Sequence, residues 1–201
     1  MKAQVGLFLI IGLIVILGVF GIGLILTYNS LVKSEKAVEE AKAQIETVIQ
    51  RRLDLIPNLV ETVKGYAQHE REVLLKVTQA RAKAQTLLGK ISSKKSLSKE
   101  DFIALSASQS ELTKTLKSLF ALVENYPDLK ASTNFLSLQD QLEGTENRIA
   151  VARQRYNYAV RIYNTKIKTF PGNIIAPMFG FGEKDYFKAK EEATEPVRVK
   201  F

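Results

Sequence analysis

Charged side chains occupy or border the apolar faces of the helices that this sequence predicts. They are Arg52, Glu70, Arg81, Glu146 and Arg153. An isolated charge in an apolar interior is strongly destabilising, so these residues are expected to pair with one another. Carboxylates in such a cluster could hold a metal ion or transfer protons. Arginine and glutamate together could instead fix the register of neighbouring helices. We favour the second interpretation and predict a buried charge network.

The single histidine and the absence of cysteine exclude several kinds of chemistry. A di-iron helical bundle needs Glu-x-x-His twice, whereas His69 is the only histidine and Tyr66 stands three residues before it. Without cysteine the chain has no disulfide, zinc–thiolate site, iron–sulfur cluster or cysteine nucleophile. No partner constellation accompanies His69, so a local hydrogen bond is expected of it. The sequence predicts no catalytic residue, no metal and no cofactor, and hence no enzyme.

Residues 76–117 carry most of the excess positive charge of a chain whose formal net charge is +8. Nine Lys and Arg residues stand against three acidic residues there. Nucleic-acid binding would call for interleaved aromatic or arginine side chains, and Phe102 is the only aromatic residue in the segment. Nucleic acid is therefore not expected as a partner. Contact with anionic lipid and simple solvation both remain open for the basic loop, whose lysines are Lys90, Lys94, Lys95 and Lys99.

Residues 170–182 form an apolar and aromatic segment near the C-terminus. Its prolines and glycines predict a non-helical conformation. Exposed to water, such a segment would promote association. It could pack on the helices, enter the membrane interface or contact a second subunit, and we favour the subunit contact. The residues expected to take part are Phe170, Ile174, Ile175, Met178, Phe179 and Phe181.

The stretch Val5–Leu26 contains 22 residues without a charge. As a helix it would extend roughly 33 Å, close to the thickness of the hydrocarbon core of a bilayer. A signal peptide has a shorter apolar region and a small-residue cleavage site, whereas Tyr28 fits an interfacial anchor. We therefore expect a single uncleaved span. Lys33, Lys36 and Lys42 after it outnumber Lys2 before it, which predicts an external N-terminus and a cytoplasmic C-terminal domain.

Beyond the span, apolar residues recur at intervals of three and four, which predicts an all-α fold. The pattern suggests four long amphipathic helices in an antiparallel four-helix bundle. Ser98 and Asp101 resemble a capping box that starts the third helix, and Thr133 or Asn134 can cap the fourth. Pro57 could make a hairpin between the first two helices or kink one helix over 31–88, and we favour the hairpin. A hairpin would turn the 89–98 loop toward the membrane.

These features predict a membrane anchor (1–27), a helical bundle (28–170) and an apolar C-terminal segment with a tail (171–201). The body resembles the LemA family of bacterial membrane proteins in several stretches. They are Tyr28-Asn29-Ser30-Leu31-Val32, RRLDLIPNLVETVKGYAQHE (51–70), VTQAR (77–81), NYPDLKAS (125–132), FLSLQDQLEGTENRIAVARQRYN (135–157) and YNTKIKTFPGNIIA (163–176). The resemblance implies an N-terminal anchor and a soluble four-helix domain, and it implies no enzymatic activity.

Together, the residues and the resemblance predict a non-enzymatic scaffold or interaction module at the bacterial inner membrane. The expected partners are the lipid bilayer, a second copy of the chain and an unidentified membrane protein. The alternative is a protein that engages or shapes lipid through the 89–99 loop and the 170–182 segment.

Overall fold

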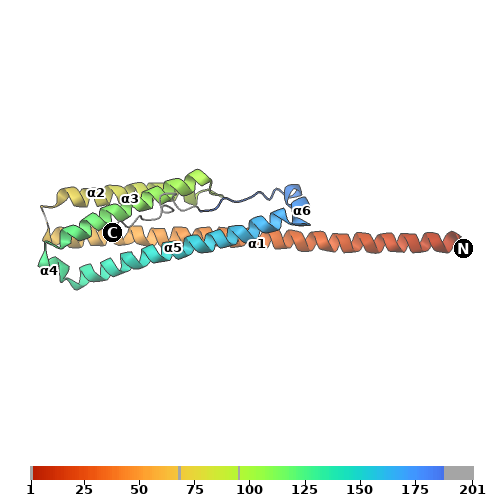
Figure 1. Cartoon of the computed structure of the whole chain (residues 1–201), viewed down its shortest axis with the longest axis horizontal. Coiled ribbons are helices and arrows are strands. Elements are labelled where there is room, and N and C mark those ends of the chain that lie inside the picture. Colours follow the sequence, from red (N-terminus) through yellow and green to blue (C-terminus); the bar gives the residue numbers. More distant parts are fainter. Residues whose placement is uncertain (1, 68, 95, 188–201) are drawn as a thin grey trace, which may run out of the picture. The chain divides into compact units, whose positions relative to one another are not determined.

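The computed structural model describes the chain except for residues 1, 68, 95 and 188–201, and of residues 2–9 it describes the backbone alone (Figure 1). The described part is helical and contains no strand. The described residues form two compact units, one of residues 2–38 and 159–184, the other of residues 39–158 and 185–187. The helices are α1 (Lys2–Tyr66), α2 (Arg71–Ser92), α3 (Lys99–Val123), α4 (Pro127–Lys130), α5 (Thr133–Lys168) and α6 (Gly172–Met178).

Pro57 lies inside α1, so the hairpin that we favoured is wrong. A proline within a helix removes one backbone hydrogen bond and can be tolerated when packing holds the helix on both sides of it. Leu53, Ile56, Leu59 and Val63 are fully buried and provide that packing. The chain turns only after Tyr66, and the second helix begins at Arg71 rather than near residue 59.

The unit formed by residues 39–158 and 185–187 has an apolar core built from α1, α2, α3 and α5. Apolar residues at helical spacing are buried in α2 and α3, among them Val77, Ala84, Leu112 and Leu116. Figure 1 shows α2 and α3 side by side. These two helices follow each other in the chain and run in opposite directions because a short connection joins them.

The start of α3 confirms the predicted capping box. The Ser98 hydroxyl accepts a hydrogen bond from the Asp101 backbone N–H, and the Asp101 carboxylate accepts one from the Ser98 N–H, at 3.3 and 3.0 Å. Helix α5 begins at Thr133, so Thr133 and Asn134, predicted as caps, lie within its first turn. Helix α2 continues to Ser92, so the connection to α3 is shorter than the predicted 89–98 loop. Pro127 begins the short helix α4.

The unit formed by residues 1–38 and 159–184 contains the beginning of α1, the end of α5 and α6. Contrary to the non-helical prediction, Gly172–Met178 is helical, because Pro177 stands near the end of α6 and disrupts little of it. Leu31, Ile175 and Ala176 form a small core with Leu24 and Phe181 against it. A Cβ atom at Gly172 would lie 1.9 Å from the Lys166 carbonyl oxygen, so this close approach requires glycine.

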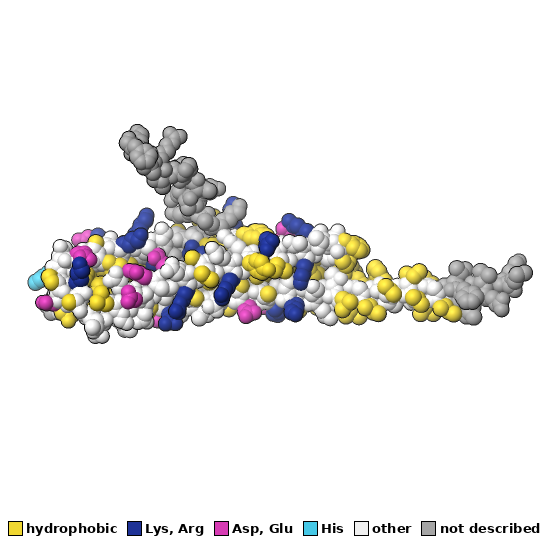
Figure 2. All heavy atoms as spheres, turned by 60° about the horizontal axis from the view of Figure 1, so that its bottom comes forward, with side chains coloured by type: hydrophobic (Ala, Val, Ile, Leu, Met, Phe, Trp, Pro, Cys, Tyr) yellow, Lys and Arg dark blue, Asp and Glu magenta, His cyan; other side chains and the backbone are white. Residues whose placement is uncertain are grey.

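Helix α1 contains a stretch long and apolar enough to cross a membrane, and none of it is buried in the structure. Figure 2 shows hydrophobic side chains along this N-terminal part of α1. An apolar helix with no protein around it needs another apolar environment. The fold is therefore all-helical with an exposed apolar N-terminal helix.

Candidate functional site

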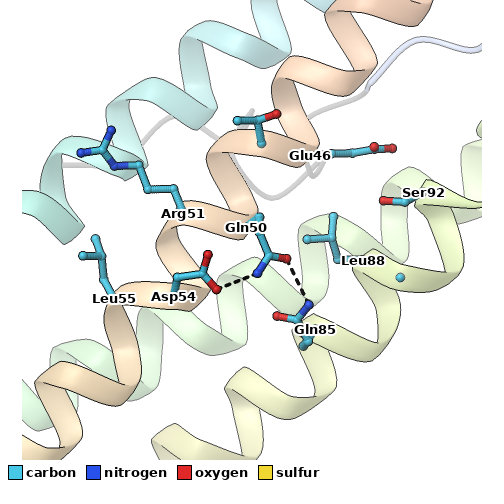
Figure 3. A pocket seen from close by; sticks show the side chains of 10 residues that line it. Glu46, Gln50, Arg51, Asp54, Leu55, Gln85, Leu88 and Ser92 are labelled. Carbon is cyan, nitrogen blue, oxygen red and sulfur yellow. Dashed lines mark hydrogen bonds between the residues drawn. The ribbon is translucent and has the colours of Figure 1, made fainter.

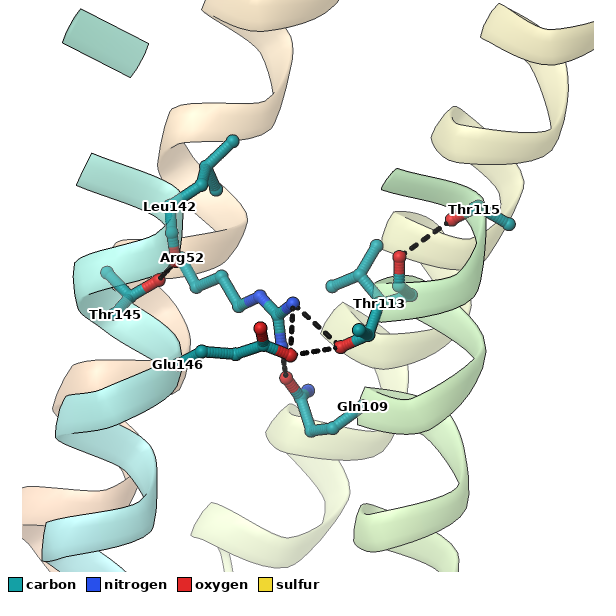
Figure 4. Close-up of polar contacts among 8 residues, drawn as sticks. Arg52, Gln109, Thr113, Thr115, Leu142, Thr145 and Glu146 are labelled. Atoms are coloured by element: carbon teal, nitrogen blue, oxygen red, sulfur yellow. Dashed lines mark hydrogen bonds and ion pairs between the residues drawn. The ribbon is translucent and has the colours of Figure 1, made fainter. Parts of the chain in front are cut away.

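Arg52 lies at the centre of a polar cluster inside the larger unit. It stands on α1 and is 3% exposed. Helix α3 contributes Gln109 and Thr113, and α5 contributes Glu146, so that three helices meet at this guanidinium group (Figure 4). The helical repeat explains the meeting, because Arg52 and Gln109 both occupy the apolar faces of their helices.

The cluster is held by short polar contacts. Arg52 Nη1 donates to Gln109 Oε1 at 3.2 Å, and Nη2 donates to Thr113 Oγ1 at 2.9 Å. The same Nη2 atom forms an ion pair with Glu146 Oε1 at 3.4 Å, and the Thr113 hydroxyl donates to that oxygen at 2.6 Å. Burial lowers the pKa of Arg52, and the charge of Glu146 opposes this shift. The guanidinium remains charged at neutral pH because its ordinary pKa is so high.

Arg153 stands beside this cluster on α5. Its guanidinium lies over the Phe187 ring, 4.4 Å from the centroid, which is a cation–π contact. Burial lowers the pKa of Arg153, and the positive charge of Arg52 lowers it further. Both arginines line a cavity of about 430 Å³ together with Glu146, Gln109, Ser106 and Ser110.

The five residues predicted as one charge network do not all meet. Arg52, Glu146 and Arg153 share the cavity just described. Glu70 instead accepts a hydrogen bond from the Tyr126 hydroxyl at 3.0 Å, and Arg81 Nε donates to the Leu53 carbonyl at 2.8 Å. We did not predict Gln109 as a partner of Arg52. Its amide stands in an otherwise apolar repeat, and a polar residue at such a position could have indicated a buried polar partner.

The basic loop is partly engaged within the protein. Lys94 Nζ pairs with Asp101 at 2.6 Å, and the Lys94 carbonyl accepts a hydrogen bond from Lys42 on α1. The Lys94 hydrogen bond and the Ser98 N–H lower the pKa of Asp101. Lys90 and Lys99 are exposed, whereas Lys95 lies outside the described residues.

The six predicted residues of the C-terminal apolar segment divide into two groups. Ile175 is buried and Phe181 packs partly against the small core. The exposed members, given with their exposed fractions, are Phe170 (78%), Met178 (69%), Phe179 (57%) and Ile174 (54%). Tyr28, just beyond the predicted span, contacts Phe179 and Phe181, with ring centroids 4.8 and 5.8 Å apart.

A second groove lies between α1 and α2 (Figure 3). Its polar side chains bond to one another, because Gln85 donates to Gln50 at 3.0 Å and Gln50 donates to Asp54 at 2.7 Å. Among the described residues no group of three or more His, Asp or Glu side chains could hold a metal ion. His69 is exposed near the turn between α1 and α2. The described geometry thus provides polar cavities but no metal centre.

Comparison with known proteins identifies the family. The model of the LemA family matches residues 41–201. The chain belongs to the LemA family. It is 26% identical to protein LemA of Metamycoplasma hominis over 184 residues, covering 92% of this chain and 79% of that protein. The predicted resemblance is therefore confirmed.

Other relatives of this LemA-family chain carry the name of magnetosome protein. MamQ of Magnetospirillum gryphiswaldense is 26% identical over 189 residues, covering 87% of this chain and 69% of the relative. MamQ 1 of Paramagnetospirillum magneticum is 26% identical over 196 residues with the same coverage. None of these names describes an enzyme. With the exposed apolar helix, the comparisons identify a membrane-associated helical protein.

Proposed function

We propose that this LemA-family chain is a non-enzymatic scaffold, anchored by one span and self-associating through the exposed apolar side chains of residues 170–182. The soluble part would be an antiparallel four-helix bundle that carries the segment. Contacts of α1 with α2, α3 and α5 through Arg81, Arg52 and Glu146 support that arrangement.

The observation that carries the proposal is the exposure of four large apolar side chains around one short helix. Phe170, Ile174, Met178 and Phe179 are exposed, in the segment whose Ile175 and Ala176 belong to the small core. Burying a side chain of this size yields roughly 1.5–3 kcal/mol. If a second copy presented the same face, the exposed side chains of both copies would be buried in a symmetric contact. Symmetric dimers are the commonest homo-oligomers.

The mass of the full-length protein in detergent tests the proposal. The variant Phe170→Ser with Met178→Ser removes the two most exposed side chains of the segment. It should give a smaller particle by light scattering than the unsubstituted chain. The matched control is Leu75→Ser with Ile103→Ser, which removes two exposed apolar side chains from α2 and α3 and should leave the mass unchanged. An unchanged mass in the first variant would contradict the subunit contact.

Lipid engagement is the alternative, and the contact of Tyr28 with Phe179 and Phe181 favours it for this segment. Tyr28 follows the apolar stretch closely, and aromatic side chains often lie at the membrane interface. The basic loop supports the alternative less, because Lys94 pairs with Asp101.

The chain has no tryptophan, so Phe179→Trp would be a single fluorescent reporter of lipid contact. Quenching by brominated lipid in nanodiscs should be strong at Phe179→Trp if lipid covers the segment. A reporter at Leu75→Trp serves as the control. Weak quenching at both sites would favour the second copy.

The proposed location is the bacterial inner membrane with the helical domain in the cytoplasm. The lysine bias around the apolar stretch supports this orientation. Because the chain has no cysteine, Ser93→Cys provides a unique and exposed thiol. Impermeant reagents should label it only after lysis, and labelling in intact cells would reverse the orientation.

A further inference from the structure

A groove between α1 and α5 in the larger unit is lined by three arginines and by no carboxylate. Arg51 comes from α1, and Arg148 and Arg155 come from α5. All three side chains are exposed, and none of them forms an ion pair with a described residue. Figure 3 shows the Arg51 side chain extending from α1 toward α5. The groove therefore carries three positive charges that none of its own side chains balances.

The same groove has an apolar floor. Val48 on α1 and Ala152 on α5 are buried beneath it, and Val151 lines it with 45% of its surface exposed. The groove has a volume of about 350 Å³. Arginine is enriched in protein–protein interfaces whereas lysine is depleted, and every cation of this groove is an arginine. The lining is thus typical of a protein-binding surface rather than of a solvated basic stretch.

The residues that α5 contributes repeat with the period of a helix. Arg148, Val151 and Arg155 follow at intervals of three and four, so they share one face of α5. Seven residues separate the two arginines, which is about 10.5 Å along the helix. A second helix laid in the groove has the same period. Two carboxylates seven residues apart on it could pair with both arginines while an apolar side chain between them packs on Val151.

We propose that this groove docks an acidic amphipathic helix of a partner protein. Charge complementarity selects the occupant, because the planar guanidinium group pairs with a carboxylate through two parallel hydrogen bonds. A second copy of the chain packed through the same groove would bring arginine toward arginine, which is repulsive. Nucleic acid would use aromatic side chains for stacking, and none lines the groove. The surface lies outside residues 170–182, so the proposal goes beyond self-association and does not depend on it.

Fluorescence anisotropy of a labelled synthetic peptide, with the full-length protein in non-ionic detergent, tests the proposal. The probe is a helical peptide with a leucine stripe flanked by glutamates seven residues apart. It should bind saturably, and its affinity should fall as the salt concentration rises. The control peptide, with glutamine at each glutamate position, should bind roughly fivefold more weakly or less. Equal binding of the two peptides would overturn the proposal.

A pair of charge-matched variants locates the site. The arginine variant, Arg148→Gln with Arg155→Gln, should weaken binding of the acidic peptide by roughly fivefold or more. Its melting temperature should be unchanged because both side chains are exposed. Arg71→Gln with Lys117→Gln removes the same charge from exposed positions on α2 and α3 and should bind as the unsubstituted chain does. Equal weakening in both variants would show general charge attraction and would overturn the proposal.

The same measurements distinguish the other possible occupants. Residues 188–201 contain Glu191, Glu192 and Glu195. If this segment filled the groove, replacing all three by glutamine would strengthen binding of the peptide, and that result would overturn the assignment to a partner. Tighter binding of a single-stranded oligonucleotide of equal charge would overturn it as well.

A second copy as the occupant would be revealed by mass. The arginine variant should keep the mass of the unsubstituted chain in detergent, and a smaller particle would overturn the docking of a partner. Self-association through residues 170–182 is tested by substitutions in that segment, so either proposal can fail without the other.

Discussion

Tyr163 is a fully buried phenol whose hydroxyl has no hydrogen-bond partner among the described residues. Burial, and to a smaller extent the negative charge of Glu35, raises the pKa of Tyr163 to about 12. Lys184 lies over its ring, 5.7 Å from the centroid, and pairs with Glu35 at 3.1 Å. The ring packs well while its polar atom is left without a bond, which is an unfavourable combination.

The variant Tyr163→Phe should therefore be as stable as the unsubstituted chain, or more stable, at neutral pH. The folded pKa exceeds the unfolded value near 10, so the folded state keeps its proton in a range where the unfolded state loses it. Stability is fully present below pH 10 and falls toward pH 12 by about 1.4 kcal/mol per pH unit. Denaturant unfolding measured at increasing pH should show a smaller loss of stability for Tyr163→Phe than for the unsubstituted chain. The exposed Tyr66→Phe should retain it.

Gly172 is the one described glycine at which a side chain would meet the backbone of another segment. Gly172→Ala should displace α6 from the Lys166 carbonyl and cost roughly 1–3 kcal/mol, the usual range for overpacking. Faster proteolysis after α5 together with a lower melting temperature would report the change. Gly182→Ala has open space around its Cβ position and should have little effect.

At the scale of helices, the sequence predicted what local chemistry determines. The apolar repeat identified the buried face of α3, and the pair Ser98 and Asp101 identified its first turn, because a cap depends on neighbouring residues only. Pro57 was misjudged because tertiary packing on both sides overrode the local preference. Helix α6 was missed because its support comes from Leu31, more than a hundred residues earlier in the chain.

The candidate site was predicted less completely than the helices, because it also depends on tertiary packing. Arg52 and Glu146 could be recognised as charges on or near apolar faces. The relative position of the helices along their axes decides which residues meet. It brings Gln109 to Arg52 and leaves Glu70 and Arg81 outside that cluster. Because the chain turns after Tyr66 and not at Pro57, the helices pair in a different register from the one that the hairpin would produce. A pattern within one helix does not reveal how that helix aligns with its neighbours.

The capping box of α3 gives a prediction at the scale of a single helix. Ser98→Ala removes the hydroxyl that accepts the Asp101 N–H and should lower the free energy of unfolding by about 1 kcal/mol. Chemical denaturation should show the loss. Ser96→Ala, an exposed neighbour in the same loop, is the control. Equal stability of the two variants would mean that the cap contributes nothing.

The larger unit has an apolar core to which α2 and α3 both contribute. Val77 is fully buried and Leu116 is 3% exposed. Val77→Asp or Leu116→Asp would bury an unpaired charge and should cost roughly 3 kcal/mol or more. Thermal melts should separate both from Lys117→Asp, an exposed position on α3. A similar loss at all three positions would contradict the packing of these helices.

Attachment is a property of the whole molecule, because none of the apolar stretch of α1 is buried within the protein. A span of about 20 apolar residues holds a protein firmly in a bilayer, so the full-length chain should stay in the membrane pellet during alkaline carbonate extraction. Ile14→Lys with Leu17→Lys places two charges at the centre of the stretch, each costing roughly 2.5–3.5 kcal/mol in the bilayer. This variant should move to the soluble fraction, whereas Ile14→Leu with Leu17→Ile should not. Release of the unsubstituted chain by carbonate would show that α1 lies at the membrane surface instead of crossing it.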